Sequence, residues 1–250
     1  MTAGDSADAQ PGLGGGEAPG GDPAVPVITI DGPSGTGKGT LAAHLAAHLG
    51  WHCLDSGALY RVLGLAAGRR GIDLDDEAAL AGLAANLGIG FAAGRVLLEG
   101  EDLGDLIRTE TAGLAASRVA VHPLVRAALL DWQRRQARPP GLVADGRDMG
   151  TLVFPRAGLK VFLDASAQER AERRYKQLMG KGLDANLSDL VEAVRQRDAR
   201  DRDRPVAPLR AAAGAVLVDS TALSADDVFE RVLEEVRRVF PDQFHQVAAD

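Results

Sequence analysis

From residue 25 onward, short apolar runs alternate with stretches of helical periodicity. Five runs are rich in β-branched or other apolar residues, as expected of strands that are buried on both faces. They are residues 26–30, 51–54, 141–145, 159–164 and 215–219. Helical patterns follow most of them; Leu41, Leu45 and Leu49, for example, form one stripe of a helix predicted over 37–49. Strands separated by helices predict an α/β fold with a doubly wound, parallel five-stranded sheet flanked by helices.

Two stretches interrupt this rhythm. Residues 72–136 separate the second and third strands by far more than a crossover needs, and they include a short hairpin over 89–100 that turns at Ala93-Gly94. We interpret them as an inserted subdomain. Residues 176–208 carry a dense charge run, which we interpret as a mobile lid. The core then comprises residues 25–71, 137–175 and 209–240, and residues 1–24, rich in Gly, Ala, Pro and Asp, are predicted to be a disordered tail.

Composition narrows the choice of function. A net charge of −7 argues against a general nucleic-acid or anionic-membrane binder, and no apolar run approaches the length of a membrane span. The single cysteine, Cys53, permits no intrachain disulfide, which fits the cytoplasm. We expect its thiol to be buried and inert, and we expect a monomer.

Residues 32–40, GPSGTGKGT, lie between the first strand and the first helix, as a phosphate-binding loop (P-loop) requires. Glycines let successive N–H groups converge on an anion, and the new helix adds its positive N-terminus. The predicted triphosphate-binding residues are Gly32, Pro33, Ser34, Gly35, Thr36, Gly37, Lys38, Gly39 and Thr40. The strict pattern places Ser or Thr directly after the lysine, but here Gly39 intervenes. Thr40 is therefore expected to bind phosphate or to face Mg²⁺ through water. This loop alone does not distinguish a kinase from a nucleotide-operated switch or a motor protein.

Polar residues follow each predicted strand. Because ligands of an open parallel sheet bind beyond the carboxyl ends of its strands, these residues are candidates for the site. They are Asp31; Asp55, Ser56, Tyr60 and Arg61; Asp145, Arg147 and Asp148; Asp164; and Asp219 and Ser220. Asp145 stands where an acid that organises Mg²⁺ through water is expected. Asp164 and Asp219 are better explained as helix or turn caps.

The charge run RQRDARDRDRPVAPL, residues 195–209, has a regular spacing. Arg197, Asp201 and Arg204 stand at i, i+4 and i+7, which places them on one helical face. Arginine forks bind phosphate oxygens in pairs. A lid with arginines on one face suits closure over a phosphoryl group, although a solvated helix face is the usual interpretation of such a run.

Several motifs occur together and in order: DGPSGTGKGT, LDSGALYR, IRTETA, ADGRDMGTLVFP, LKVFLDAS, ERAERR and RDARDRDRPVAPL. From about residue 25 to 238 the chain resembles the bacterial cytidylate kinases. The resemblance implies ATP and Mg²⁺ as phosphoryl donor and cofactor, with CMP or dCMP as acceptor, giving ADP and (d)CDP.

The resemblance also assigns roles to individual residues. It implies a CMP site made of Ser56, Tyr60, Arg61, Ser117, Arg126, Asp145, Arg147, Asp148, Arg197 and Asp201. Within it, Ser117, Arg126 and Asp148 would read the base. The catalytic residues implied are Lys38, Arg147, Arg197 and Arg204, and Arg173 joins the ATP site beside Arg170 and Arg174.

The acceptor phosphate is mostly ionised at neutral pH, so the reaction needs no general base, and we expect direct in-line transfer. Three alternatives stay open on the residues alone: another small-molecule P-loop kinase, with uridylate for example as acceptor; a nucleotide-operated switch; and a nucleic-acid-binding ATPase.

Overall fold

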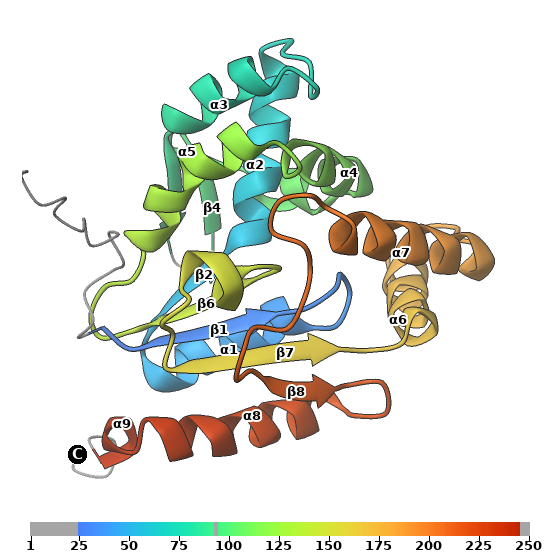
Figure 1. The fold of residues 1–250 in the computed structure, drawn as a ribbon. Helices are drawn as coiled ribbons and strands as arrows, with labels where there is room; N and C mark the ends of the chain where they lie inside the picture. Colours follow the sequence, from blue (N-terminus) through green and yellow to red (C-terminus); the bar gives the residue numbers. More distant parts are fainter. Residues whose placement is uncertain (1–24, 93–94, 246–250) are drawn as a thin grey trace, which may run out of the picture.

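The computed structural model describes residues 25–92 and 95–245, so the predicted tail over 1–24 and the hairpin turn at Ala93-Gly94 lie outside the described residues. A parallel sheet has the strand order β2-β6-β1-β7-β8 (Figure 1). Its strands are β1 (Val27–Asp31), β2 (His52–Asp55), β6 (Leu142–Gly146), β7 (Leu159–Asp164) and β8 (Val216–Asp219). The predicted fold class is confirmed, and each strand begins within one residue of its predicted start. The glycine-rich loop leaves β1, which stands at the centre of the sheet.

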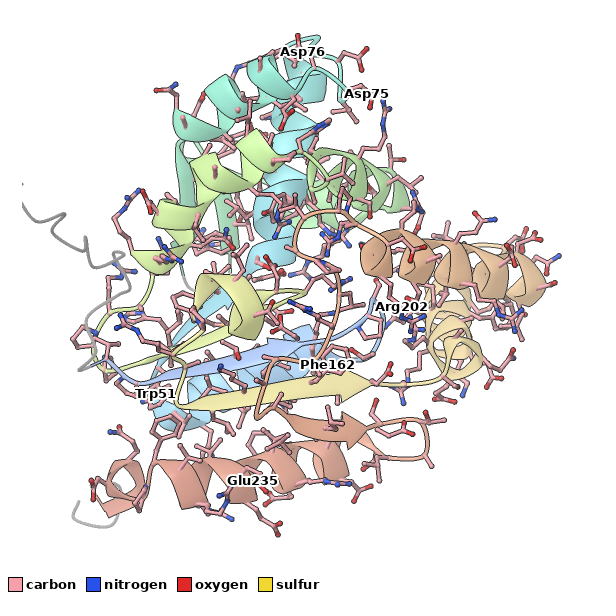
Figure 2. The ribbon with its side chains drawn as sticks, in the orientation of Figure 1. Trp51, Asp75, Asp76, Phe162, Arg202 and Glu235 are labelled. Carbon is pink, nitrogen blue, oxygen red and sulfur yellow. The ribbon has the colours of Figure 1, made fainter. Side chains whose placement is uncertain are left out.

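Helices cover one face of this sheet. The helices α1 (Lys38–Leu49) and α8 (Ala225–Val239) pack against Ile28, Ile30 and Val143, while the short α9 (Asp242–His245) ends the described chain. Alternation along the strands turns Leu142 to the opposite face, where it meets the π-helical segment η2 (Met149–Val153). Trp51, labelled in Figure 2, packs against Phe240 in an edge-to-face arrangement. These two packed layers lie beneath the loops that follow β1 and β6.

A second hydrophobic cluster lies within the predicted insert, residues 72–136, and the helix that precedes it. The insert itself consists of helices and a small antiparallel sheet. Its elements are α3 (Glu77–Ala85), α4 (Glu110–Val119), α5 (Pro123–Arg134), the 3₁₀ turn η1 (Gly104–Arg108) and the strands β3 (Ile89–Ala92), β4 (Arg95–Leu98) and β5 (Glu101–Asp102). The helix α2 (Ser56–Arg69) packs its buried face into this cluster, with Leu63 against the insert. A Cβ at Gly64 would lie 2.8 Å from that of Ala115, so glycine permits the close approach of α2 and α4.

Two charged helices precede and form the region that the sequence predicts as a lid, residues 176–208; the first reaches it only with its last residues, and the second lies wholly within it. They are α6 (Ala167–Gly180) and α7 (Leu187–Arg202), which pack on each other beside the carboxyl ends of the strands (Figure 1). Ser166 caps α6 by accepting from the backbone of Glu169, but the Glu169 carboxylate binds Arg173 and does not complete a capping box. A complete box does form at the start of α8, between Ser224 and Asp227.

Within the two described ranges, no single helix has the length and apolar character to cross a membrane. One pair of helices, α4 and α5, passes the same test together, with a bend of 103° between them.

Candidate active site

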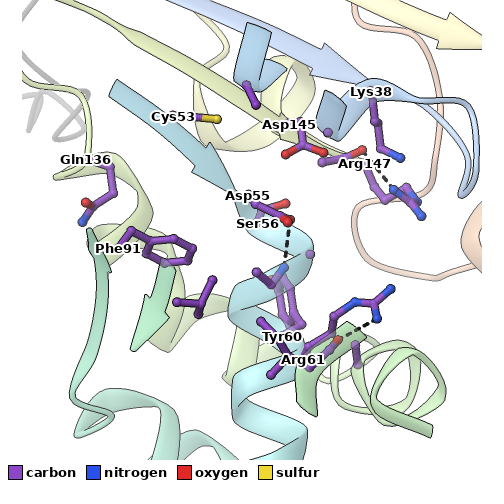
Figure 3. A pocket seen from close by; sticks show the side chains of 18 of the residues that line it. Lys38, Cys53, Asp55, Ser56, Tyr60, Arg61, Phe91, Gln136, Asp145 and Arg147 are labelled. Carbon is purple, nitrogen blue, oxygen red and sulfur yellow. Dashed lines mark hydrogen bonds between the residues drawn. The ribbon is translucent and has the colours of Figure 1, made fainter. Parts of the chain in front are cut away.

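A cleft of about 1080 Å³ opens beyond the carboxyl ends of β1, β2 and β6 (Figure 3). Segments far apart in the sequence meet there. The predicted site residues that line it are Ser34, Lys38, Gly39, Thr40, Ser56, Tyr60, Arg61, Ser117, Arg126, Asp145, Arg147, Asp148, Arg197, Asp201 and Arg204. Among the predicted residues, those that do not line the cleft are Gly32, Pro33, Gly35, Thr36, Gly37 and Arg173. The cleft therefore joins the glycine-rich loop to the insert and to α7.

The loop after β1 is shaped for an anion. A Cβ on Gly32 would lie 2.0 Å from the Leu163 carbonyl oxygen, so the loop could not pass the end of β7 with any other residue. Gly37, with φ of +93°, is the N-cap of α1 and supplies no capping side chain. The first N–H groups of α1 are consequently left for a ligand. Lys38 Nζ donates to the Pro33 carbonyl over 2.9 Å.

Lys38 and Asp145 both line the cleft, and burial perturbs the pKa of each side chain. Burial, followed by the positive charge of Arg147, lowers the pKa of Lys38 to about 7. Burial, followed by the negative charge of Asp55, raises the pKa of Asp145 to about 8. The Asp145 Oδ1 atom is buried and has no hydrogen-bond partner among the residues that the structure describes. An anionic ligand would stabilise the charged form of Lys38, and a hydrated cation would stabilise the charged form of Asp145.

On the insert side, Arg126 from α5 and Asp148 form a buried ion pair. Arg126 also donates to the Ala120 carbonyl over 3.2 Å and lies 5.7 Å from the centre of the Tyr60 ring. Burial raises the pKa of Tyr60 to about 12, which keeps its hydroxyl neutral. Ser117, half-buried on α4, lines the same pocket. A carboxylate, a guanidinium and a hydroxyl can together read the edge of a planar polar ring.

Arginines lie between these two ends of the cleft. Arg147 Nε donates to Asp201 Oδ2 over 2.8 Å, and Arg204 Nε donates to the Asp201 backbone oxygen over 3.3 Å. Burial works against the charge of Asp201, but Arg147 holds the pKa of that carboxyl below its ordinary value. Arg197 Nε and Arg204 Nη2 are buried without a partner within residues 25–92 and 95–245. Buried donors of this kind are available to phosphate oxygens.

Burial, followed by the charge of Arg147, also lowers the pKa of Arg197 to about 10, so this guanidinium remains charged at neutral pH. Arg61, on α2, donates to the Ile107 carbonyl of η1 over 2.8 Å, and this contact holds its guanidinium group against the insert (Figure 3).

Sequence reasoning missed some of the groups that shape this site. Gln133 is buried and hydrogen-bonds Tyr60; its i, i+7 spacing from Arg126 on α5 was the available signal. The charge run over 195–209 does not distinguish Asp198 from its exposed neighbours, but this residue is only 4% exposed. Cys53 was expected to be buried, and that was wrong, because β2 is an edge strand and the residue is exposed. Partial desolvation by the surrounding protein, followed by the negative charge of Asp145, nevertheless raises the pKa of the thiol to about 12, which keeps it protonated.

Comparison with known proteins gives a consistent result. The family model described as "Cytidylate kinase" matches residues 28–238. A cytidylate kinase of Aeromonas salmonicida is 59% identical over 213 residues, covering 84% of this chain and 93% of that protein. One from Stutzerimonas stutzeri is 57% identical over 218 residues, covering 85% and 95%. Among solved structures, TT1252 from Thermus thermophilus has a TM-score of 0.43 and 22% identity, covering 86% of this chain and 98% of that one.

Proposed function

Because the chain belongs to the cytidylate kinase family, we propose that its cleft binds ATP at the glycine-rich loop and CMP or dCMP at the insert. The chain is an ATP-dependent nucleoside monophosphate kinase, and it transfers the γ-phosphoryl group of ATP to (d)CMP, giving ADP and (d)CDP. The division of the cleft into a donor end and an acceptor end, and the role of each residue below, are parts of the proposal.

One observation carries the proposal: a single cleft connects the loop around Lys38 with the buried pair Arg126 and Asp148. At the acceptor end, Asp148 can accept from the exocyclic amine of cytosine, while Arg126 donates to the ring acceptors. Ser117 adds a hydroxyl to this set, and Ser56 and Tyr60 bound the pocket. Asp201 accepts from a sugar hydroxyl beside Arg197.

Transfer then requires alignment and neutralisation of charge. The acceptor oxygen belongs to a phosphate that is mostly ionised at neutral pH, so no residue needs to remove a proton from it. Lys38, Arg147, Arg197 and Arg204 surround the region through which the phosphoryl group passes. Preorganised cations there stabilise the charge of the transition state. Arg61 holds the acceptor phosphate. Arg173 steadies the glycine-rich loop, since its Nη1 donates to the Thr36 carbonyl over 3.4 Å.

The residues fit a magnesium ion that is carried by nucleotide and water. Across the described ranges, no group of three or more His, Cys, Asp or Glu could hold a metal ion. The unpartnered Asp145 Oδ1 would accept from water bound to Mg²⁺, and the exposed Thr40 hydroxyl lies at the same end of the cleft. When bound, Mg²⁺ would neutralise the β- and γ-phosphates. The monomeric state, the cytoplasmic location and the mobility of the lid stay predictions.

Two experiments test the proposal. Initial rates of ADP formation at fixed ATP, with CMP, dCMP and UMP compared, should give the highest kcat/KM for a cytidine nucleotide. A higher value for UMP, or ATP turnover that is independent of the acceptor, would contradict it. Direct in-line transfer predicts inversion of configuration at a chiral γ-phosphate, whereas retention would require a phosphoenzyme.

A further inference from the structure

The Arg170 side chain, on α6, lies outside the set of groups proposed to touch substrate, but it contacts three separate segments of the fold. It is 2% exposed. Its Nε donates to the Ala165 carbonyl over 2.9 Å at the end of β7, and its Nη1 donates to the Ser34 carbonyl over 3.0 Å in the glycine-rich loop. Nη1 and Nη2 also form a two-pronged ion pair with Asp198 of α7. One guanidinium thus joins the sheet, the loop and the lid helix.

The contact with Ser34 determines which way part of the loop faces. In a trans peptide, the carbonyl and the N–H of the next residue point in opposite directions. Because Arg170 draws the Ser34 carbonyl outward, the Gly35 N–H points to the other side of the loop. A Cβ at Gly35 would lie only 3.4 Å from the Arg170 Cβ, so the loop also packs on the stem of this side chain.

The contact with Asp198 determines how α7 is placed. Asp198 follows Arg197 directly and precedes Asp201 by three residues, so the buried pair is less than one turn from the face that lines the cleft. Any rotation or slide of α7 that moved Arg197 would have to break a buried, bidentate interaction.

Stability alone does not explain such a pair. Desolvation of two charges offsets much of their attraction, and apolar side chains of similar volume often serve a fold equally well. A guanidinium fork does supply fixed geometry.

We propose that Arg170 and Asp198 are positioning residues: they set the loop that holds the ATP phosphates and the lid arginines in one fixed relation. This inference rests on the proposed function. It assigns the pair no contact with either substrate. It predicts a larger effect on the transfer step than on CMP binding, because the base-reading groups Ser117, Arg126 and Asp148 are not on α7.

The test replaces both charges with apolar groups in the variant Arg170→Met/Asp198→Leu, which leaves no unpaired buried charge. Its thermal midpoint should stay within a few degrees of the wild-type value. We expect kcat to fall at least about tenfold, since small misplacements of reacting groups are costly, while the Kd for CMP from calorimetry changes less than about threefold. The matched control is Arg238→Met/Glu235→Leu, which removes the Arg238–Glu235 pair on α8 and should leave kcat unchanged.

The outcomes are distinct. A folded double variant with wild-type kcat, or one whose Kd for CMP rises by as large a factor as its kcat falls, would overturn the inference alone. Absence of CMP phosphorylation by the wild-type protein would overturn the proposed function and this inference with it. If the double variant does not fold, Arg170→Lys decides the question. It keeps the charge but cannot reach the loop and both carboxylate oxygens at once, so a wild-type kcat there would also overturn the proposal.

Discussion

Asp31 ends β1 and holds the segment that follows β6. Its two carboxylate oxygens accept from the backbone N–H groups of Met149 and Gly150, each over 2.8 Å. These residues directly follow Arg147 and Asp148, so the contact fixes the base of two proposed site residues. Burial is the largest influence on Asp31, and it raises the pKa of this carboxyl from 3.8 to about 6 despite the two hydrogen bonds.

The shift gives stability a defined pH dependence. Between the two pKa values, the folded state binds a proton at Asp31 that the unfolded state has already lost. The contribution of this residue is therefore fully present below pH 3.8 and is lost as pH rises through about 6. The full shift of about two pH units corresponds to roughly 3 kcal/mol, and about 2 kcal/mol of it falls between pH 4.5 and 7.5.

The Asp31→Asn variant isolates this effect because asparagine does not titrate. Urea unfolding of both proteins at a series of pH values should show the free energy of wild type, relative to the variant, falling by about 2 kcal/mol from pH 4.5 to 7.5. As a control, the wild-type advantage over Asp219→Asn should stay flat from pH 4.5 to 7.5, because hydrogen bonds from Thr221 lower the pKa of Asp219 and its stability effect therefore lies at more acidic pH. A wild-type advantage over Asp31→Asn that stays flat or grows with pH would refute the reasoning.

The proposed roles lead to further expectations. Lys38→Ala and Arg147→Ala should each lower kcat at least roughly a hundredfold, because each removes a preorganised charge; near wild-type rates in steady-state assays would reject the assignment. A Cβ at Gly32 would lie 2.0 Å from a backbone oxygen of β7, so Gly32→Ala should destabilise the protein by about 1–3 kcal/mol in urea unfolding. Gly68→Ala, in open space on α2, should instead be neutral or stabilising, and equal effects would contradict the steric argument. Asp148→Asn should raise the KM for CMP about ten- to a hundredfold and leave the KM for ATP unchanged; equal changes in both would disprove a role confined to the acceptor.

The parts of the fold that follow from periodicity were predictable from the sequence. Residues 26–30 and 159–164 are mostly apolar, as expected of strands in a covered parallel sheet, and both form strands. Strand order was less accessible, since local patterns do not state which strand lies beside which. The placement of β6 between β1 and β2 depends on contacts between residues more than 80 positions apart, such as Leu54 with Ala144.

The residues of the site also differ in whether a local sequence pattern identifies them. Lys38 could be named because the glycine-rich loop is a local signal with a physical reason for each residue type. The burial of Arg170 could not be inferred, because its neighbours in sequence suggested a solvated helix face equally well. Its partners, Ser34 and Asp198, come from segments that no local spacing relates to it.

The separate hydrophobic cluster of the insert has a consequence for diversification of this chain. Leu80 and Val125 pack within that cluster, whereas Ile28 and Leu45 belong to the layer under the sheet. Because changes at distant sites without shared neighbours are nearly additive, mutations in one cluster should be tolerated independently of the other. Mutations in the insert could therefore change the preference for the acceptor nucleotide during evolution, while the binding of ATP at the glycine-rich loop is retained.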